Sequence, residues 1–122
     1  MLLIAQILAG LVCLIHIYIF LLETVLFRSR GVKVFAVKPE NVELLATPMS
    51  NQGCYNGFLA LALLLGFVLP NPAAAMALTV YGLVCVAIAG IWGAVTVKTS
   101  ILYIQTVPAV LALLAFYVAL RT

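Results

Sequence analysis

The sequence predicts an all-α integral membrane protein, a four-helix up-down bundle that forms a single domain over residues 1–122. Hydrophobic residues make up 67% of the chain and charged residues only 7%, which is far from the composition of a soluble domain. The apolar residues fall into four runs of the length that crosses a bilayer. These runs are too long, and alternate too little, to be barrel strands, so the backbone must satisfy its own hydrogen bonds as helices.

The four predicted spans use nearly the whole chain and leave no room for a soluble domain. The first lacks the basic start and small-residue cleavage site of a secretory signal, so we expect an uncleaved span. Short connections make neighbouring helices antiparallel. The spans cover residues 2–22, 48–69, 72–97 and 101–120.

Proline and capping residues mark the predicted helix starts. Thr47-Pro48 and Asn71-Pro72 each place a capping side chain before a proline at the first helical position. Thr99-Ser100 offers caps for the fourth helix. These signals predict where the second, third and fourth helices begin.

The one long connection, residues 28–47, lies between the first two spans and has two parts. Residues 28–38 are basic and contain a glycine, whereas residues 39–45 begin with proline and two acidic residues, as a helix does. A short helix on the membrane surface and a solvated tether with basic anchors both fit this pattern.

The distribution of Lys and Arg predicts the orientation. Five of them lie in the connections after the first and third spans, and only Arg121 lies on the opposite side. The positive-inside rule therefore places these connections in the cytoplasm and both termini outside. The net charge of +3 then suits the anionic surface of the lipid bilayer. No basic patch interleaved with aromatic residues indicates nucleic-acid binding.

The cysteines give little support to a metal or disulfide site. Cys13, Cys54 and Cys85 lie singly in three different spans. Cys13 and His16 share a helix face, but two ligands leave a tetrahedral site half empty. We therefore expect no metal and no cofactor.

Small residues recur at four-residue spacing in two spans. Gly53 and Gly57 lie in the second, and the pairs Ala89/Gly93 and Gly90/Ala94 lie in the third. Such pairs let helix backbones approach closely in a membrane. We expect them to serve contacts within the chain, with a homodimer as the alternative.

Polar residues of three spans are predicted to lie at one depth. Glu23 follows His16 by seven residues, so the two share a face of the first helix and lie about 10 Å apart along its axis. Ionisable residues in or beside a span are functional-site hypotheses by default. Span two starts at the same side with four polar residues, and span four adds one. The candidate ligand-binding or proton-coupling residues are His16, Glu23, Asn51, Gln52, Tyr55, Asn56 and Gln105.

Each central member of this set also has a plain structural interpretation. Glu23 can extend to the interface or pair with Arg28 or Lys33, and a neutral His16 can fasten helices through hydrogen bonds. Pro108 removes a backbone bond and is expected to kink the fourth helix beside Gln105. A hydrated pocket open to the cytoplasm remains the functional interpretation.

The polar strings also resemble a known family. Residues 51–60 read NQGCYNGFLA, residues 89–96 read AGIWGAVT and residues 105–109 read QTVPA. Together with His16 and Glu23, they resemble a family of short bacterial four-helix membrane proteins of unknown function. The resemblance implies a four-span protein of the bacterial inner membrane and brings no activity with it.

Three classes of function remain open. The polar set can bind a small or lipidic ligand in a proton-coupled carrier, with Glu23 or His16 exchanging protons. It can serve as the acid–base site of a membrane enzyme acting on a lipid-soluble substrate. In an accessory or structural subunit, the same residues would only fix helix packing.

Overall fold

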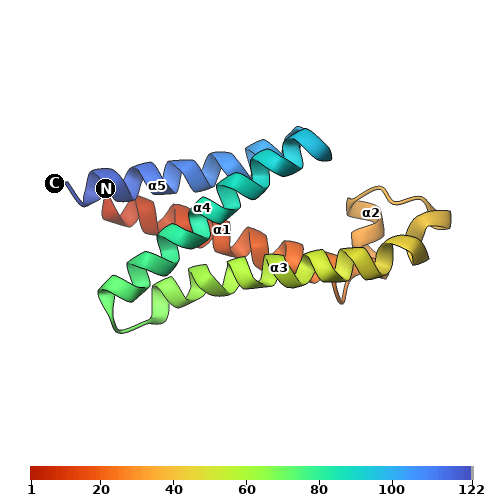
Figure 1. Cartoon of the computed structure of the whole chain (residues 1–122), viewed down its shortest axis with the longest axis horizontal. Helices are drawn as coiled ribbons and strands as arrows, with labels where there is room; N and C mark the ends of the chain where they lie inside the picture. Colours follow the sequence, from red (N-terminus) through yellow and green to blue (C-terminus); the bar gives the residue numbers. More distant parts are fainter. Residues whose placement is uncertain (122) are drawn as a thin grey trace. The chain divides into compact units, whose positions relative to one another are not determined.

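The structure is a computed structural model that describes residues 1–121, and these form helices and connections without a strand. The long helices are α1 (Leu2–Glu23), α3 (Val42–Val68), α4 (Pro72–Thr96) and α5 (Val107–Ala119) (Figure 1). Short segments join them, namely the π-helical η1 (Phe27–Gly31), α2 (Val32–Val34), the 3-10 turn η2 (Pro39–Asn41) and the π-helical η3 (Leu102–Thr106).

Four helical segments are long and apolar enough to cross a membrane, as the sequence predicted. The all-α prediction is confirmed with them, whereas the bundle arrangement, the single domain and the sidedness of the termini stay predictions. The four segments are Leu2–Glu23, Pro39–Val68, Pro72–Thr96 and Leu102–Ala119.

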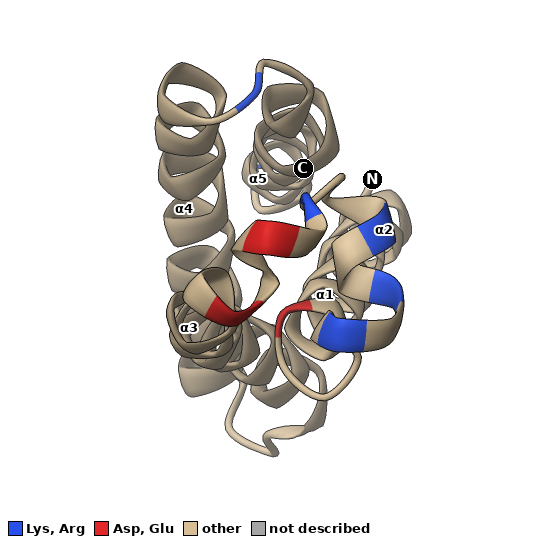
Figure 2. Ribbon diagram, turned by 90° about the vertical axis from the view of Figure 1, so that its right-hand side faces the viewer, with Lys and Arg blue, Asp and Glu red and all other residues tan. Residues whose placement is uncertain are grey.

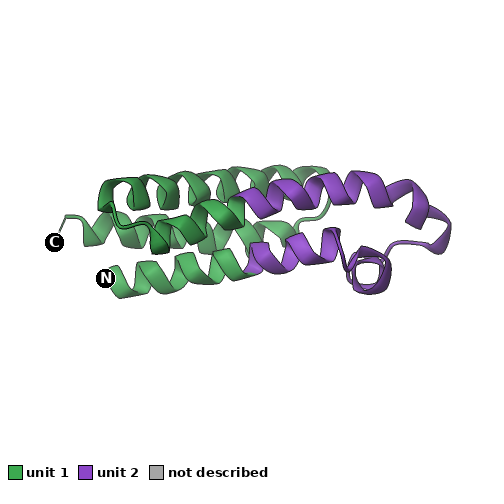
Figure 3. Cartoon of the chain, turned by 90° about the horizontal axis from the view of Figure 1, so that it is seen from below, with its two compact units in different colours: residues 1–14, 59–122 green, residues 15–58 purple. Residues whose placement is uncertain are grey.

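The chain divides into two compact units (Figure 3). Unit 1 consists of Met1–Leu14 and Leu59–Thr122, and unit 2 of Ile15–Phe58. Unit 2 therefore holds the end of α1, the whole connection and the first half of α3. Every close contact of the candidate site described below lies inside unit 2.

The predicted start of the second span at Thr47-Pro48 is wrong. Helix α3 begins at Val42 and runs through Pro48. Pro39 takes the starting position instead, after an extended Lys38 with ψ 143°. At an interior position Pro48 only removes the backbone bond to the carbonyl of Leu44, four residues earlier, and the helix continues past it.

The connection between α1 and α3 is folded rather than extended. The N–H of Gly31 donates to the carbonyl of Leu26 at 2.9 Å. A Cβ at Gly31 would stand 2.3 Å from the carbonyl oxygen of Leu22 and 3.1 Å from the ring of Phe27. Only glycine allows this approach, which holds η1 against the end of α1. The interpretation of this stretch as a solvated tether is therefore wrong for η1 and α2.

In unit 1 the start of α4 is as predicted. The side chain of Asn71 accepts a hydrogen bond from the N–H of Ala74 at 3.1 Å, and Pro72 occupies the first helical turn. Asn71 therefore caps the 25-residue apolar helix that follows.

Close packing in unit 1 also uses glycine. The hydroxyl of Thr106 in η3 donates to the carbonyl of Ala87 in α4 at 3.0 Å, and a Cβ at Gly90 would stand 2.3 Å from that hydroxyl. The N–H of Val107 bonds to the carbonyl of Leu102, five residues back. This π-helical turn comes directly before Pro108 and presents Thr106 to α4.

Candidate functional site

Glu23 is the last residue of α1 and is only 2% exposed. Its two carboxylate oxygens accept hydrogen bonds from two amides of α3. Nε2 of Gln52 donates to Oε1 at 2.9 Å, and Nδ2 of Asn56 donates to Oε2 at 2.7 Å. We call these three residues the Glu23 clamp. Among the described residues, the Glu23 carboxylate bonds to these amides and not to Arg28 or Lys33, which the alternative interpretation had offered as partners.

The spacing of the two amides along α3 explains the clamp. Gln52 and Asn56 are four residues apart, so they lie on one helix face, one above the other. Nδ2 of Asn56 also contacts the carbonyl oxygen of Gln52 at 3.3 Å. This second bond orients the amide that reaches Glu23.

Two glycines bring α3 close enough to α1 for these bonds. A Cβ at Gly53 would stand 2.7 Å from Cγ2 of Thr24 and 3.0 Å from Cβ of Glu23. A Cβ at Gly57 would stand 3.0 Å from the ring of Phe20. The predicted Gly53/Gly57 pair is therefore used inside the chain, whereas a homodimer through small residues stays a prediction.

His16 is fully buried, one turn of α1 after the buried Cys13 and two turns before Glu23. The burial of both His16 and Glu23 agrees with the predicted shared face of α1. Proton coupling by His16 stays a prediction.

Tyr55 and Asn51, two further predicted residues, are exposed and do not take part in the clamp. Tyr55 is 62% exposed and meets Phe58 edge-on, with ring centroids 6.1 Å apart. Asn51 is exposed as well. Gln105 is half-buried in unit 1, and its place beside the clamp stays a prediction. Tyr55 therefore cannot bridge His16 and Glu23 in this arrangement, because its ring points outward.

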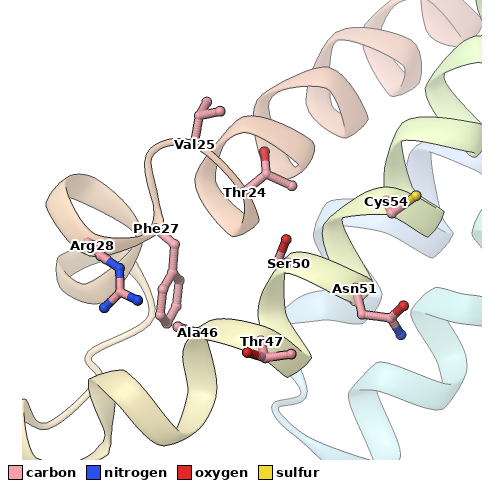
Figure 4. A pocket seen from close by; sticks show the side chains of 9 residues that line it. All are labelled: Thr24, Val25, Phe27, Arg28, Ala46, Thr47, Ser50, Asn51 and Cys54. Carbon is pink, nitrogen blue, oxygen red and sulfur yellow. The ribbon is translucent and has the colours of Figure 1, made fainter.

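A pocket of about 620 Å³ opens beside the clamp, between the end of α1, η1 and the first half of α3 (Figure 4). Thr24 directly follows Glu23 on one wall, and Ser50 and Asn51 directly precede Gln52 on the other. We call it the open pocket. Its lining residues are Thr24, Val25, Phe27, Arg28, Ala46, Thr47, Ser50, Asn51 and Cys54.

The lining combines hydroxyl, amide and guanidinium groups with apolar side chains. In Figure 4 the hydroxyl of Ser50 is directed toward Thr24, and the ring of Phe27 points toward Ala46. The hydroxyl of Thr24 donates to the carbonyl of Phe20 at 2.6 Å.

The side chain of Arg28 forms an ion pair with Glu43, and both are well exposed. Most members of the open pocket were not predicted from the sequence. The available signal was the adjacency of Thr24 and Ser50 to the predicted polar residues.

Residues 10–117 match the model of a protein family described as protein of unknown function (DUF1304). The chain belongs to this family. The matched residues include the whole Glu23 clamp and the whole lining of the open pocket. No curated protein and no solved structure matches the DUF1304 chain. Within residues 1–121, no three His, Cys, Asp or Glu side chains gather as metal ligands would.

Proposed function

We propose that this DUF1304 protein is a multi-pass membrane protein that binds a small or lipidic molecule in the open pocket. The observation that carries the proposal is the position of the pocket against the Glu23 clamp. Because Thr24 adjoins Glu23, and Ser50 and Asn51 adjoin Gln52, the clamp fixes both walls of the pocket. The predicted sidedness puts the pocket at the cytoplasmic face, in a bacterial inner membrane.

The chemistry of the clamp favours a role beyond helix packing. A buried carboxylate at the end of a membrane span is costly, and neutral polar side chains fasten membrane helices without that cost. When ionised, the carboxylate of Glu23 accepts one amide N–H at each oxygen. When a proton binds, one oxygen becomes an O–H donor and its amide bond is lost. Protonation would therefore loosen one wall of the open pocket.

This linkage favours a proton-coupled carrier as the second candidate function. A carrier must change the exposure of its site, and the breaking of one clamp bond supplies such a change. An acid–base enzyme and a purely structural subunit are the competing classes from the sequence. The two experiments below distinguish these four functions: ligand binding alone, proton-coupled transport, acid–base catalysis and a structural role.

Filling the pocket tests the binding proposal. Ser50→Trp places a large side chain in the open pocket, whereas Tyr55→Trp adds bulk to the outward face of the same helix. We expect native mass spectrometry of the purified wild type to show a bound molecule that Ser50→Trp lacks and Tyr55→Trp keeps. Identical bound species on all three proteins would refute the proposal.

Glu23→Gln tests the carrier. With the molecule identified above, wild-type protein in vesicles with a pH gradient should give flux linked to proton movement. We expect Glu23→Gln to abolish the proton-linked part while the protein keeps its helical content. A variant that only unfolds at lower temperature, with flux unchanged, would favour the structural role. Chemical conversion of the molecule by the wild type would favour the enzyme.

A further inference from the structure

Positive charge dominates the segment that borders the open pocket. Arg28 is the one charged residue of the lining, and Arg30 and Lys33 follow it on η1 and α2. Figure 2 shows this concentration of basic residues on the segment around α2. The carboxylates of the same connection, Glu40 and Glu43, are exposed and outside the lining, and Glu43 pairs with Arg28. Because this connection carries four basic residues and only two acidic ones, its charge balance still favours an anion at the pocket mouth.

The pocket wall also offers hydrogen-bond donors that the protein does not use. Within residues 1–121, the side chains of Thr47 and Ser50 make no hydrogen bond to other protein groups. Hydroxyl groups can donate to anionic oxygens. The planar guanidinium of Arg28 can donate two parallel bonds to a phosphate or carboxylate group.

The lining also has apolar members. Val25 is 78% exposed and lines the open pocket together with the half-buried Ala46 and the buried Phe27. Val25 lies two residues after the end of a candidate span, a position close to the depth of lipid headgroups. A free inorganic anion would gain nothing from these side chains, whereas an acyl chain would cover them.

We propose that the ligand of the open pocket is an anionic lipid, with its phosphate or carboxylate headgroup on Arg28 and its chain against Val25 and Ala46. This inference rests on the proposed function and names its ligand class. Without a ligand, Arg28 forms an ion pair with Glu43. Exposed ion pairs add little stability, so the headgroup replaces Glu43 by exchanging one anion for another.

Cys54 supplies a local probe. It lines the pocket and is exposed, whereas Cys85 is half-buried in unit 1 and Cys13 is buried. Reaction with N-ethylmaleimide, followed for each cysteine by peptide mass spectrometry, reports occupancy of the pocket at Cys54. The reaction at Cys85 is the internal reference.

The experiment uses the full-length protein in nanodiscs of zwitterionic lipid and four added probes. These are dodecyl phosphate, dodecyl maltoside, dodecyltrimethylammonium and inorganic phosphate. We expect dodecyl phosphate to protect Cys54 about tenfold more strongly than the others, as one charge-assisted contact allows. Arg28→Gln should remove this preference and Glu43→Gln should strengthen it. Arg30→Gln removes the same charge from outside the pocket lining, so as the matched control it should reduce the preference far less than Arg28→Gln.

Each outcome has a distinct meaning. Equal protection by all three amphiphiles would overturn the anionic-lipid inference and leave the proposed function standing. Equal protection by inorganic phosphate would make the ligand a free anion and also overturn the inference. No protection by any probe would overturn the proposed function as well. If Arg28→Gln does not fold, a Glu43→Gln protein with no gain in protection overturns the inference.

Discussion

The replacement of Gly90 by alanine tests the close packing of α4 on η3. The added Cβ would stand 2.3 Å from the hydroxyl of Thr106, 2.9 Å from its backbone nitrogen and 3.0 Å from Cβ of Gln105. Because a backbone atom is among them, a side-chain rotation cannot relieve the clash. The bond from Thr106 to Ala87 is lost as η3 moves away. Overpacking costs about 1–3 kcal/mol and the lost bond about 1 kcal/mol, so we expect a destabilisation of about 2–4 kcal/mol.

Gly10→Ala is the matched control, because its Cβ would meet only the ring of Phe67, at 3.8 Å. Alanine is better than glycine in a helix by about 1 kcal/mol, so this variant should be neutral or stabilised. Both free energies of unfolding can be measured by dodecyl sulfate titration of the purified protein in mixed micelles, with circular dichroism as the signal. Stabilities that agree within about 0.5 kcal/mol, the usual range of surface substitutions, would refute the packing argument.

Two further substitutions test one contact in each unit. Gly31→Ala places a Cβ 2.3 Å from the carbonyl oxygen of Leu22, so η1 should detach from α1 and trypsin should cleave faster after Arg28; an unchanged cleavage rate would contradict this account of the connection. Thr106→Val keeps the shape of the side chain but loses the 3.0 Å bond to Ala87, which should cost about 1 kcal/mol in the same micelle titration; a stability equal to the wild type would show that the bond contributes nothing.

Hydropathy and capping residues predicted much of the fold, because a chain that spans a membrane has few alternatives to helices. The spans follow from the length of the apolar runs, and Asn71 caps α4 as its position before proline indicates. The start of α3 could not be read in the same way. Pro39 and Pro48 both follow residues compatible with a helix start, and a proline after the first turn is also tolerated at a local cost. The sequence indicated a helix start at Pro39, but only the folded chain shows that this helix continues through Pro48 into the second span.

The candidate site was predicted well along the helix axis and less well around it. Depth placed Asn51, Gln52, Tyr55 and Asn56 at the level of Glu23, but only Gln52 and Asn56 reach its carboxylate. The angle around α3 decides this, at about 100° per residue. Gly53 marks the face that approaches α1, and Tyr55 and Asn51 point away from that face.

The open pocket depends on features that the sequence does not display. The π-helical turn of η1 and the approach of Gly31 to Leu22 place Arg28 at its mouth. Neither feature leaves a periodic pattern of apolar residues, because each concerns the backbone path of a few positions. From the sequence alone, η1 and its surroundings could therefore be recognised only as part of a hydrophilic connection.

The coupling energy between Glu23 and Asn56 is the most direct measurement of the central claim, that a buried carboxylate joins α1 to α3. A double-mutant cycle of Glu23→Gln and Asn56→Ala gives it, with unfolding measured in mixed micelles. The account predicts a coupling of about 1–2 kcal/mol. The parallel cycle with Asn51→Ala, an exposed asparagine of the same helix, should give a value near zero. Equal couplings for Asn51 and Asn56 would contradict the clamp.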